Sequence, residues 1–154
     1  MFSENLSQVE RDYYKNLLLS NSERFIASES SEKEYGKYLG GLVKTPLGAV
    51  RMGENQYKKF IAKHRGNLFI AARNTLERPI LVFTAENGAV VYVKSFIDDS
   101  EKQKNIISVV IVKDSSSVVI STHEERMNQI LNKMKKTGIL YEKAPGLRDG
   151  TVQK

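Results

Sequence analysis

Hydrophobic residues recur at helical spacing in the first part of the chain. Over residues 6–19 they lie three or four positions apart, and this spacing predicts an amphipathic helix. The residues on its apolar face are Leu6, Val9, Tyr13 and Leu17. A serine-rich break follows, where Ser30 or Ser31 can cap a second short helix that runs to Tyr38. The two glycines at 40–41 end this helical segment.

The next stretch mixes short strands and helices. Thr45-Pro46-Leu47-Gly48 is typical of a turn between two short strands within residues 42–52. A helix is expected to open at residues 53–55. The residues that share its face are Tyr57, Phe60, Ile61 and, in the last turn, His64. Residues 68–76 predict a further helix, which Pro79 ends.

After Pro79 the hydrophobic period becomes that of strands. Four runs rich in β-branched residues follow, namely Ile80–Thr84, Val90–Ile97, Ile106–Lys113 and Val118–Thr122. Asn87-Gly88 is a hairpin signal, and short links between the runs predict an antiparallel meander. A helix over Glu124–Lys136 is expected to close the fold, with Gly138 as its stop. The pattern predicts an α+β domain: N-terminal helices, a four-stranded antiparallel sheet and a C-terminal helix, with the helices on one face.

Composition excludes several classes of protein. A length of 154 residues suits one domain, and the absence of cysteine excludes disulfides and thiolate metal sites. No apolar run is long enough for a membrane helix, and the first residues lack a signal-peptide pattern. We therefore expect a cytoplasmic protein, either of the producing cell or of a target cell.

Charge is distributed unevenly. Residues 1–41 hold 5 Lys/Arg and 7 Asp/Glu, a net of −2, whereas residues 42–154 hold 19 and 11, a net of +8. This shift predicts a helical leader (1–41), a basic body (42–143) and a flexible tail (144–154). A basic body favours a polyanionic partner, most simply nucleic acid; the alternative is a solvated basic surface without a partner.

The candidate chemistry centres on the junction after the fourth strand run. Ser121-Thr122-His123 place two hydroxyls and an imidazole at the expected strand end, beside a helix start. The two histidines are far apart, and no phosphate-binding loop or metal motif is present. Histidine, lysine, arginine, serine and threonine can cleave RNA without metal. The 2′-hydroxyl attacks the phosphodiester while a base, an acid and cations assist.

Four separated blocks carry a family resemblance. They are Thr45–Gln56, Thr75–Pro79, Tyr92–Phe96 and Ile120–His123. In order and spacing, residues 43–141 resemble the phage branch of the barnase, EndoU, colicin and RelE-like nucleases. Domains of this group are often fused to the carboxyl end of MuF-type phage head proteins. The resemblance implies a RelE/barnase-like fold, an RNA-cleaving toxin and an inhibitor protein as partner, and it does not cover the leader. An acidic inhibitor would complement the net charge of +8 on the body.

The resemblance makes His123 the first choice as general acid or base. The structural alternative is that His123 caps the next helix. Ser121 and Thr122 are expected to position the phosphate. Alternatively, one of them is the helix N-cap, with Glu125 completing a capping box after Thr122.

Three further residues are secondary catalytic candidates, each with a structural alternative. Lys94 is expected to stabilise the phosphorane; alternatively it lies on a solvated outer face of its strand. His64 can be the second acid–base residue, or it can simply favour a helix C-terminus. Arg73 can clamp a phosphate, or it can lie on the wet face of its helix. Residues expected to contact RNA without catalysing are Lys58, Lys59, Lys63, Arg65, Tyr92, Ser95 and Arg126.

These expectations converge on a metal-independent endoribonuclease from a phage or mobile element, with no cofactor and no membrane association. Two alternatives remain. The chain can be a non-catalytic RNA- or protein-binding module that keeps the fold, or the leader can dock a partner while the body only packs.

Overall fold

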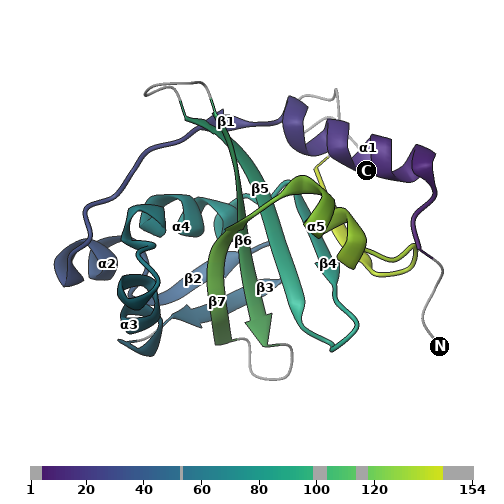
Figure 1. Cartoon of the computed structure of the whole chain (residues 1–154). Helices are drawn as coiled ribbons and strands as arrows, with labels where there is room; N and C mark the ends of the chain where they lie inside the picture. Colours follow the sequence, from purple (N-terminus) through teal and green to yellow (C-terminus); the bar gives the residue numbers. More distant parts are fainter. Residues whose placement is uncertain (1–4, 53, 99–103, 114–117, 144–154) are drawn as a thin grey trace.

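The computed structural model describes residues 5–52, 54–98, 104–113 and 118–143 (Figure 1). The helices are α1 (Gln8–Ser20), α2 (Glu32–Tyr38), α3 (Glu54–Ala62), the 3₁₀ turn η1 (Gly66–Leu68), α4 (Phe69–Glu77) and α5 (Met127–Lys133). The strands are β1 (Glu23–Arg24), β2 (Gly41–Thr45), β3 (Gly48–Met52), β4 (Leu81–Thr84), β5 (Val90–Asp98), β6 (Lys104–Lys113), β7 (Val118–Glu125) and β8 (Ile139–Glu142).

The centre of the sheet is the antiparallel meander β4–β5–β6–β7, as the spacing predicts. The sheet is larger than the four strands expected from the sequence, because the described residues form an eight-stranded sheet. Strand β8 extends it beside β4, the hairpin β2–β3 joins β7 in parallel at Arg51, and the short β1 runs parallel to the end of β5. Strands β2 and β3 are the short pair expected around the Thr-Pro-Leu-Gly turn, whereas β1 and β8, with two and four residues, are too short for a clear alternation in sequence.

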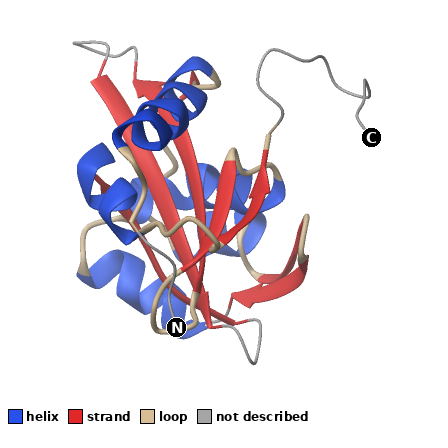
Figure 2. Cartoon of the chain, turned by 90° about the vertical axis from the view of Figure 1, so that its right-hand side faces the viewer, coloured by secondary structure: helices blue, strands red, loops and turns tan. Residues whose placement is uncertain are grey.

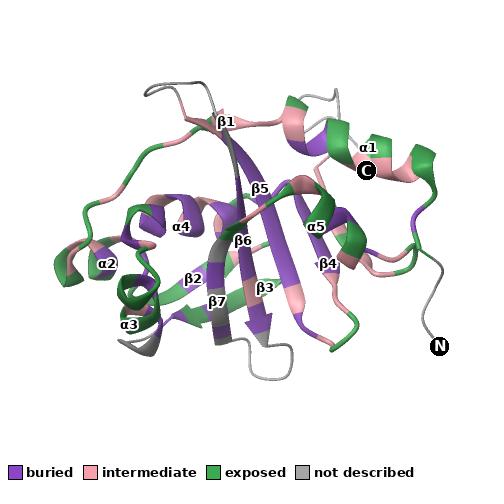
Figure 3. Ribbon diagram, viewed as in Figure 1, coloured by how far each residue is buried: buried purple, intermediate pink, exposed green. Residues whose placement is uncertain are grey.

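Helices cover both faces of the sheet, which corrects the expectation of one covered face. Successive residues of β5 point to opposite sides. Tyr92 lies in an apolar cluster with Phe69 and Leu76 of α4, whereas Val93 lies in a second cluster with residues of α1 and α5. Figures 1 and 2 show the long central strands running between these helices, and Figure 3 shows how thoroughly β5 is buried.

The β2–β3 hairpin folds over the α4 face of the sheet. Val43 and Val50 are buried in the same cluster as Tyr92 of β5, and α4 contacts β2 as well as β6. The Tyr92 hydroxyl and the Thr45 hydroxyl lie 2.9 Å apart and share a hydrogen bond. The hairpin is therefore part of the main core, not a peripheral arm.

The leader also contributes to the core of the body. Ser7 caps α1 in a capping box with Glu10, which fixes where the helix begins. Leu17 and Leu18 of α1 are buried against Val93 and against α5. None of the helices in the described ranges is long and apolar enough to cross a membrane. Separate folding of residues 1–41 and 42–143 stays a prediction, but these contacts show that the two segments share a core.

Candidate functional site

The Ser-Thr-His sequence lies inside β7, not at its end. The register pairs Ser121 with Ile111, Thr122 with Val110 and His123 with Val109, and the strand continues to Glu125. Helix α5 begins only at Met127, after Arg126 as N-cap residue, so the expected helix from Glu124 is wrong at its start.

The capping roles considered for this sequence do not occur. The N-cap position belongs to Arg126, whose backbone N–H donates to Gln129 Oε1 at 3.0 Å. Ser121, Thr122 and His123 are strand residues and cap no helix. The side chains of Ser121 and His123 are outside the described part of the structure. The catalytic roles of these residues stay predictions.

The strand register places the candidate residues in different rows of the sheet. His123 pairs with Val109, which pairs with Val93, and both valines lie in the core beneath α1 and α5. Thr122 belongs to the next row, with Val110 and Tyr92, which face α4. Lys94 lies on the other side of the His123 row, in the row with Ser108 and Glu124.

Helix α3 and the loop after it close the outer edge of β7. Strand β3 pairs with β7 only at Val118, so the following carbonyls need other donors. The buried Gln56 side chain donates from Nε2 to the Val119 carbonyl at 2.7 Å, and Arg65 donates from Nη1 to the Thr122 carbonyl at 3.0 Å. The Thr122 hydroxyl is buried and has no hydrogen-bond partner among the described residues. Sequence reasoning missed Gln56, although it lies within the first resembling block.

His64 does not lie in the last turn of α3, because the helix ends at Ala62. It has φ = 56° and is exposed. Its N–H donates to the Ile61 carbonyl and that of Arg65 donates to the Phe60 carbonyl. These two bonds form a Schellman motif, with His64 at the left-handed position that glycine usually occupies. A left-handed histidine is strained, and strain of this kind concentrates at functional sites.

One stretch, residues 41–65, has a large excess of positive over negative residues, and we call it the basic segment. It holds six Lys/Arg and one Asp/Glu, a net of +5 in a chain whose net charge is +6. The segment forms β2, β3 and α3, and both β3 and α3 contact β7. Its exposed cations are Lys44, Arg51, Lys58, Lys59 and Lys63. The fold therefore brings an excess of positive charge beside the strand that carries Ser-Thr-His.

Lys94 is buried, contrary to the alternative of a solvated outer face. Its side chain is 2% exposed, and Nζ lies 2.7 Å from Glu23 Oε2. Nζ also donates to Asn74 Oδ1 at 3.0 Å and to the Arg78 carbonyl at 2.8 Å. An ammonium has three protons, so these acceptors use all of them. The contacts favour a structural role for Lys94, in which it joins the leader, α4 and β5; the catalytic role stays a prediction.

Burial and pairing act in opposite directions on this ion pair. Burial lowers the pKa of Lys94, and the carboxylate of Glu23 opposes this effect only in part. For Glu23, burial acts to raise the pKa, but the hydrogen bonds and charges of Lys94, Asn74 and Arg78 outweigh it and lower the pKa below its usual value. The lowered pKa keeps the Glu23 carboxylate ionised at neutral pH. No sequence signal connects Glu23 with Lys94, because the pair forms only when β1 pairs with β5.

Three further candidates, Arg73, Tyr92 and Ser95, bind other groups of the protein. Arg73 forms an ion pair with Glu77 at 2.8 Å and donates to the Tyr38 carbonyl. Ser95 is buried, and its hydroxyl lies 2.7 Å from that of Ser22. Buried Tyr92 and Ser95 contact protein groups, whereas Arg126 is exposed. In the described ranges, no three His, Asp or Glu side chains gather as a metal site would need.

We expect Glu23→Gln to lower the free energy of unfolding by about 2–3 kcal/mol at pH 7, because it leaves buried Lys94 charged without a carboxylate. Glu23 is partly exposed, and solvent screening makes this loss of stability smaller than for a fully buried ion pair. The pKa of Glu23 is lower in the folded protein than its unfolded value of 4.5, so ionised Glu23 stabilises the fold above about pH 4.5. This stabilisation is lost as the pH falls through the folded-state pKa. Urea unfolding should therefore show the two proteins converging in acid. The exposed Glu29→Gln is the control, and equal stability of both variants at pH 7 would contradict the prediction.

We expect His64→Gly to be more stable than His64→Ala by about 1 kcal/mol, because glycine adopts the left-handed conformation without a Cβ clash. Both variants remove the imidazole, so the comparison isolates backbone strain. Thermal unfolding of the two variants side by side measures the difference. Equal melting temperatures would show that position 64 is not held in the left-handed region.

Comparisons of the chain with protein-family models, with curated proteins and with solved structures found no match. A function can therefore be inferred only from the residues themselves and from the arrangement of β7, α3 and the basic segment.

Proposed function

We propose that the protein is a metal-independent endoribonuclease whose RNA-binding surface is formed by the basic segment and β7. The observation that carries the proposal is the packing of a segment with a net charge of +5 against the strand that contains Ser121-Thr122-His123. Polyanion affinity comes mainly from such lysines and arginines, and the histidine, serine and threonine of that strand are of the residue types that RNA cleavage needs. The resemblance to phage-type RelE/barnase-like nucleases supports the same activity.

In the proposed reaction, the 2′-hydroxyl of RNA attacks the neighbouring phosphorus, and the bond from phosphorus to the 5′-oxygen of the next nucleotide breaks. His123 takes the proton of the 2′-hydroxyl or gives one to the leaving oxygen. His64 is the candidate for the complementary step, since it is the other histidine of the chain and is exposed at the end of α3. Cations of the basic segment stabilise the charged phosphorane. Lys94 and Arg73 are less suited to this role, because both bind protein acceptors.

A non-catalytic RNA-binding module is the second candidate. The internal contacts of Lys94 and Arg73 favour it, because they reduce the number of cations available to a reaction centre. The two candidates share the basic segment and differ in whether His123 affects cleavage.

We expect the purified protein to cleave total RNA in the presence of EDTA, and we expect His123→Ala to reduce the rate by on the order of 100-fold or more while RNA binding is retained. His64→Ala distinguishes the acid–base pair from a single essential histidine, because only a pair predicts a comparable loss and a change in the pH–rate profile. The control is Lys33→Ala, an exposed cation on α2.

RNA that is bound but not cleaved by the wild-type protein would support the binding module instead. Cleavage at equal rates by the wild-type protein and His123→Ala would support the ribonuclease activity and show that His123 is not a catalytic residue.

We expect Lys63→Ala to weaken RNA binding and to reduce the slope of log affinity against log salt by about 0.7, the loss of one phosphate contact on single-stranded RNA. The exposed Lys33→Ala should leave both quantities unchanged, because Lys33 lies in the acidic leader. Salt titrations by fluorescence anisotropy measure the slope. Equal slopes for the two variants would place the RNA away from α3.

A further inference from the structure

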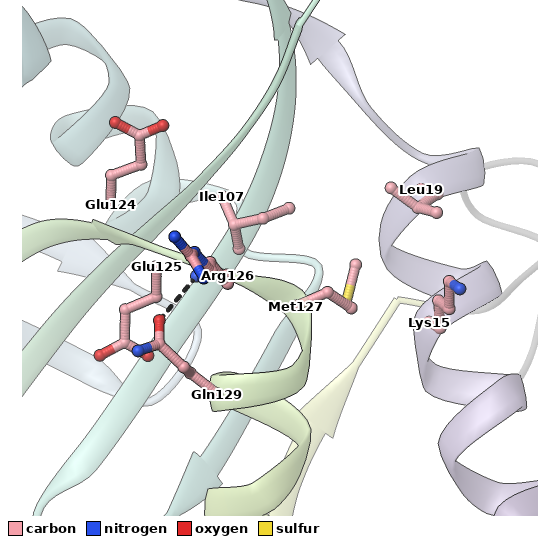
Figure 4. A pocket seen from close by; sticks show the side chains of 8 residues that line it. All are labelled: Lys15, Leu19, Ile107, Glu124, Glu125, Arg126, Met127 and Gln129. Atoms are coloured by element: carbon pink, nitrogen blue, oxygen red, sulfur yellow. Dashed lines mark hydrogen bonds between the residues drawn. The ribbon is translucent and has the colours of Figure 1, made fainter.

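A cleft of about 700 Å³ lies between α1 and the junction of β7 with α5, and we call it the α1–α5 cleft (Figure 4). Its walls come from both parts of the chain: Lys15 and Leu19 from the leader, Ile107 from β6, and Arg126 and Met127 from the start of α5. This volume falls within the range of small-ligand sites in proteins, roughly 300–1,000 Å³.

The cleft combines an apolar floor with positive charge. Leu19, Ile107 and Met127 supply the apolar surface, and Lys15 and Arg126 supply cations. Glu124 points away from the other labelled side chains in Figure 4. The carboxylate of Glu125 forms an ion pair with Lys133 at 2.6 Å, so its charge is balanced within the protein. The remaining surface suits a ligand with a flat apolar part and a negative group.

The backbone register places this cleft next to the row that contains His123. Ile107 pairs with Glu125, and Val109, two residues along β6, pairs with His123. Two residues of a strand span about 7 Å, and residues two apart share a face. The row of His123 is therefore one repeat away from the cleft floor, a separation comparable to the length of one nucleotide.

We propose that the α1–α5 cleft binds one nucleotide of the RNA substrate, the one whose 3′-phosphate is cleaved. Its base lies on Leu19, Ile107 and Met127, and its phosphate is held by Lys15 or Arg126 toward the row of His123. The planar guanidinium of Arg126 suits both a base face and a phosphate. This inference rests on the proposed ribonuclease function and deepens it, because it makes the leader a part of the substrate site.

The test uses the full chain and measures binding of the four nucleoside 3′-monophosphates by calorimetry in EDTA. Leu19→Glu places a carboxylate in the cleft, and Lys15→Ala removes a cation. Leu19 is only partly buried and Lys15 is exposed, so both substitutions are compatible with the fold. The matched control is Val9→Glu, which places the same charge on the same helix at a position that is 79% exposed. Unfolding curves confirm that each variant is folded.

We expect at least one nucleotide to bind the wild-type protein and the control, and we expect at least tenfold weaker binding to Leu19→Glu and to Lys15→Ala. Nucleotide binding that neither variant changes would overturn the inference. RNA cleavage without detectable nucleotide binding would also overturn it, while the ribonuclease function would stand. Nucleotide binding that Leu19→Glu abolishes, in a protein that does not cleave RNA, would support the cleft as a nucleotide site and remove the catalytic proposal.

Discussion

The burial of β5 on both of its faces is the constraint on which the rest of the structure depends. A strand covered on both sides needs two apolar layers, and α2 to α4 with the β2–β3 hairpin supply one while α1 and α5 supply the other. Every polar group inside that strand also needs an internal partner. Lys94 forms an ion pair with Glu23 and a hydrogen bond with α4, and the hydroxyls of Ser95 and Ser22 share a hydrogen bond. The leader is therefore held to the body by polar contacts as well as by apolar packing.

The local parts of this fold could be predicted from the sequence. The helix periods, the Thr-Pro-Leu-Gly turn and the four strand runs all follow from interactions between residues close in the chain. The second covered face of the sheet was missed because Lys94 in the middle of β5 suggested a solvated face, and its distant partner Glu23 leaves no signal in the sequence. The short strands β1 and β8 could not be predicted either, because only their pairing with β5 and β4 defines them.

The candidate site, too, was predicted in its local sequence features but not in its long-range contacts. The sequence draws attention to Ser121-Thr122-His123 by composition, but the end of the strand was misplaced because Glu124 and Glu125 are common in helices. The structure instead carries β7 past His123 and closes its edge with Gln56 and Arg65. Hydrogen bonds to backbone carbonyls leave no pattern in a sequence, so neither residue could be recognised as an edge-closing group. The same contacts bring the basic segment beside the strand that carries the histidine.

The position of α1 has a consequence for the order of folding. Leu18 is synthesised before Ile130 and Leu131, the residues of α5 with which it shares a core cluster. Contacts this distant in sequence form slowly, and nascent chains emerge from the ribosome amino end first. The apolar face of α1 therefore stays uncovered by α5 until α5 has emerged, and only then is the cleft between the two helices completed. A toxic activity that needed this cleft would stay silent on the ribosome that makes it.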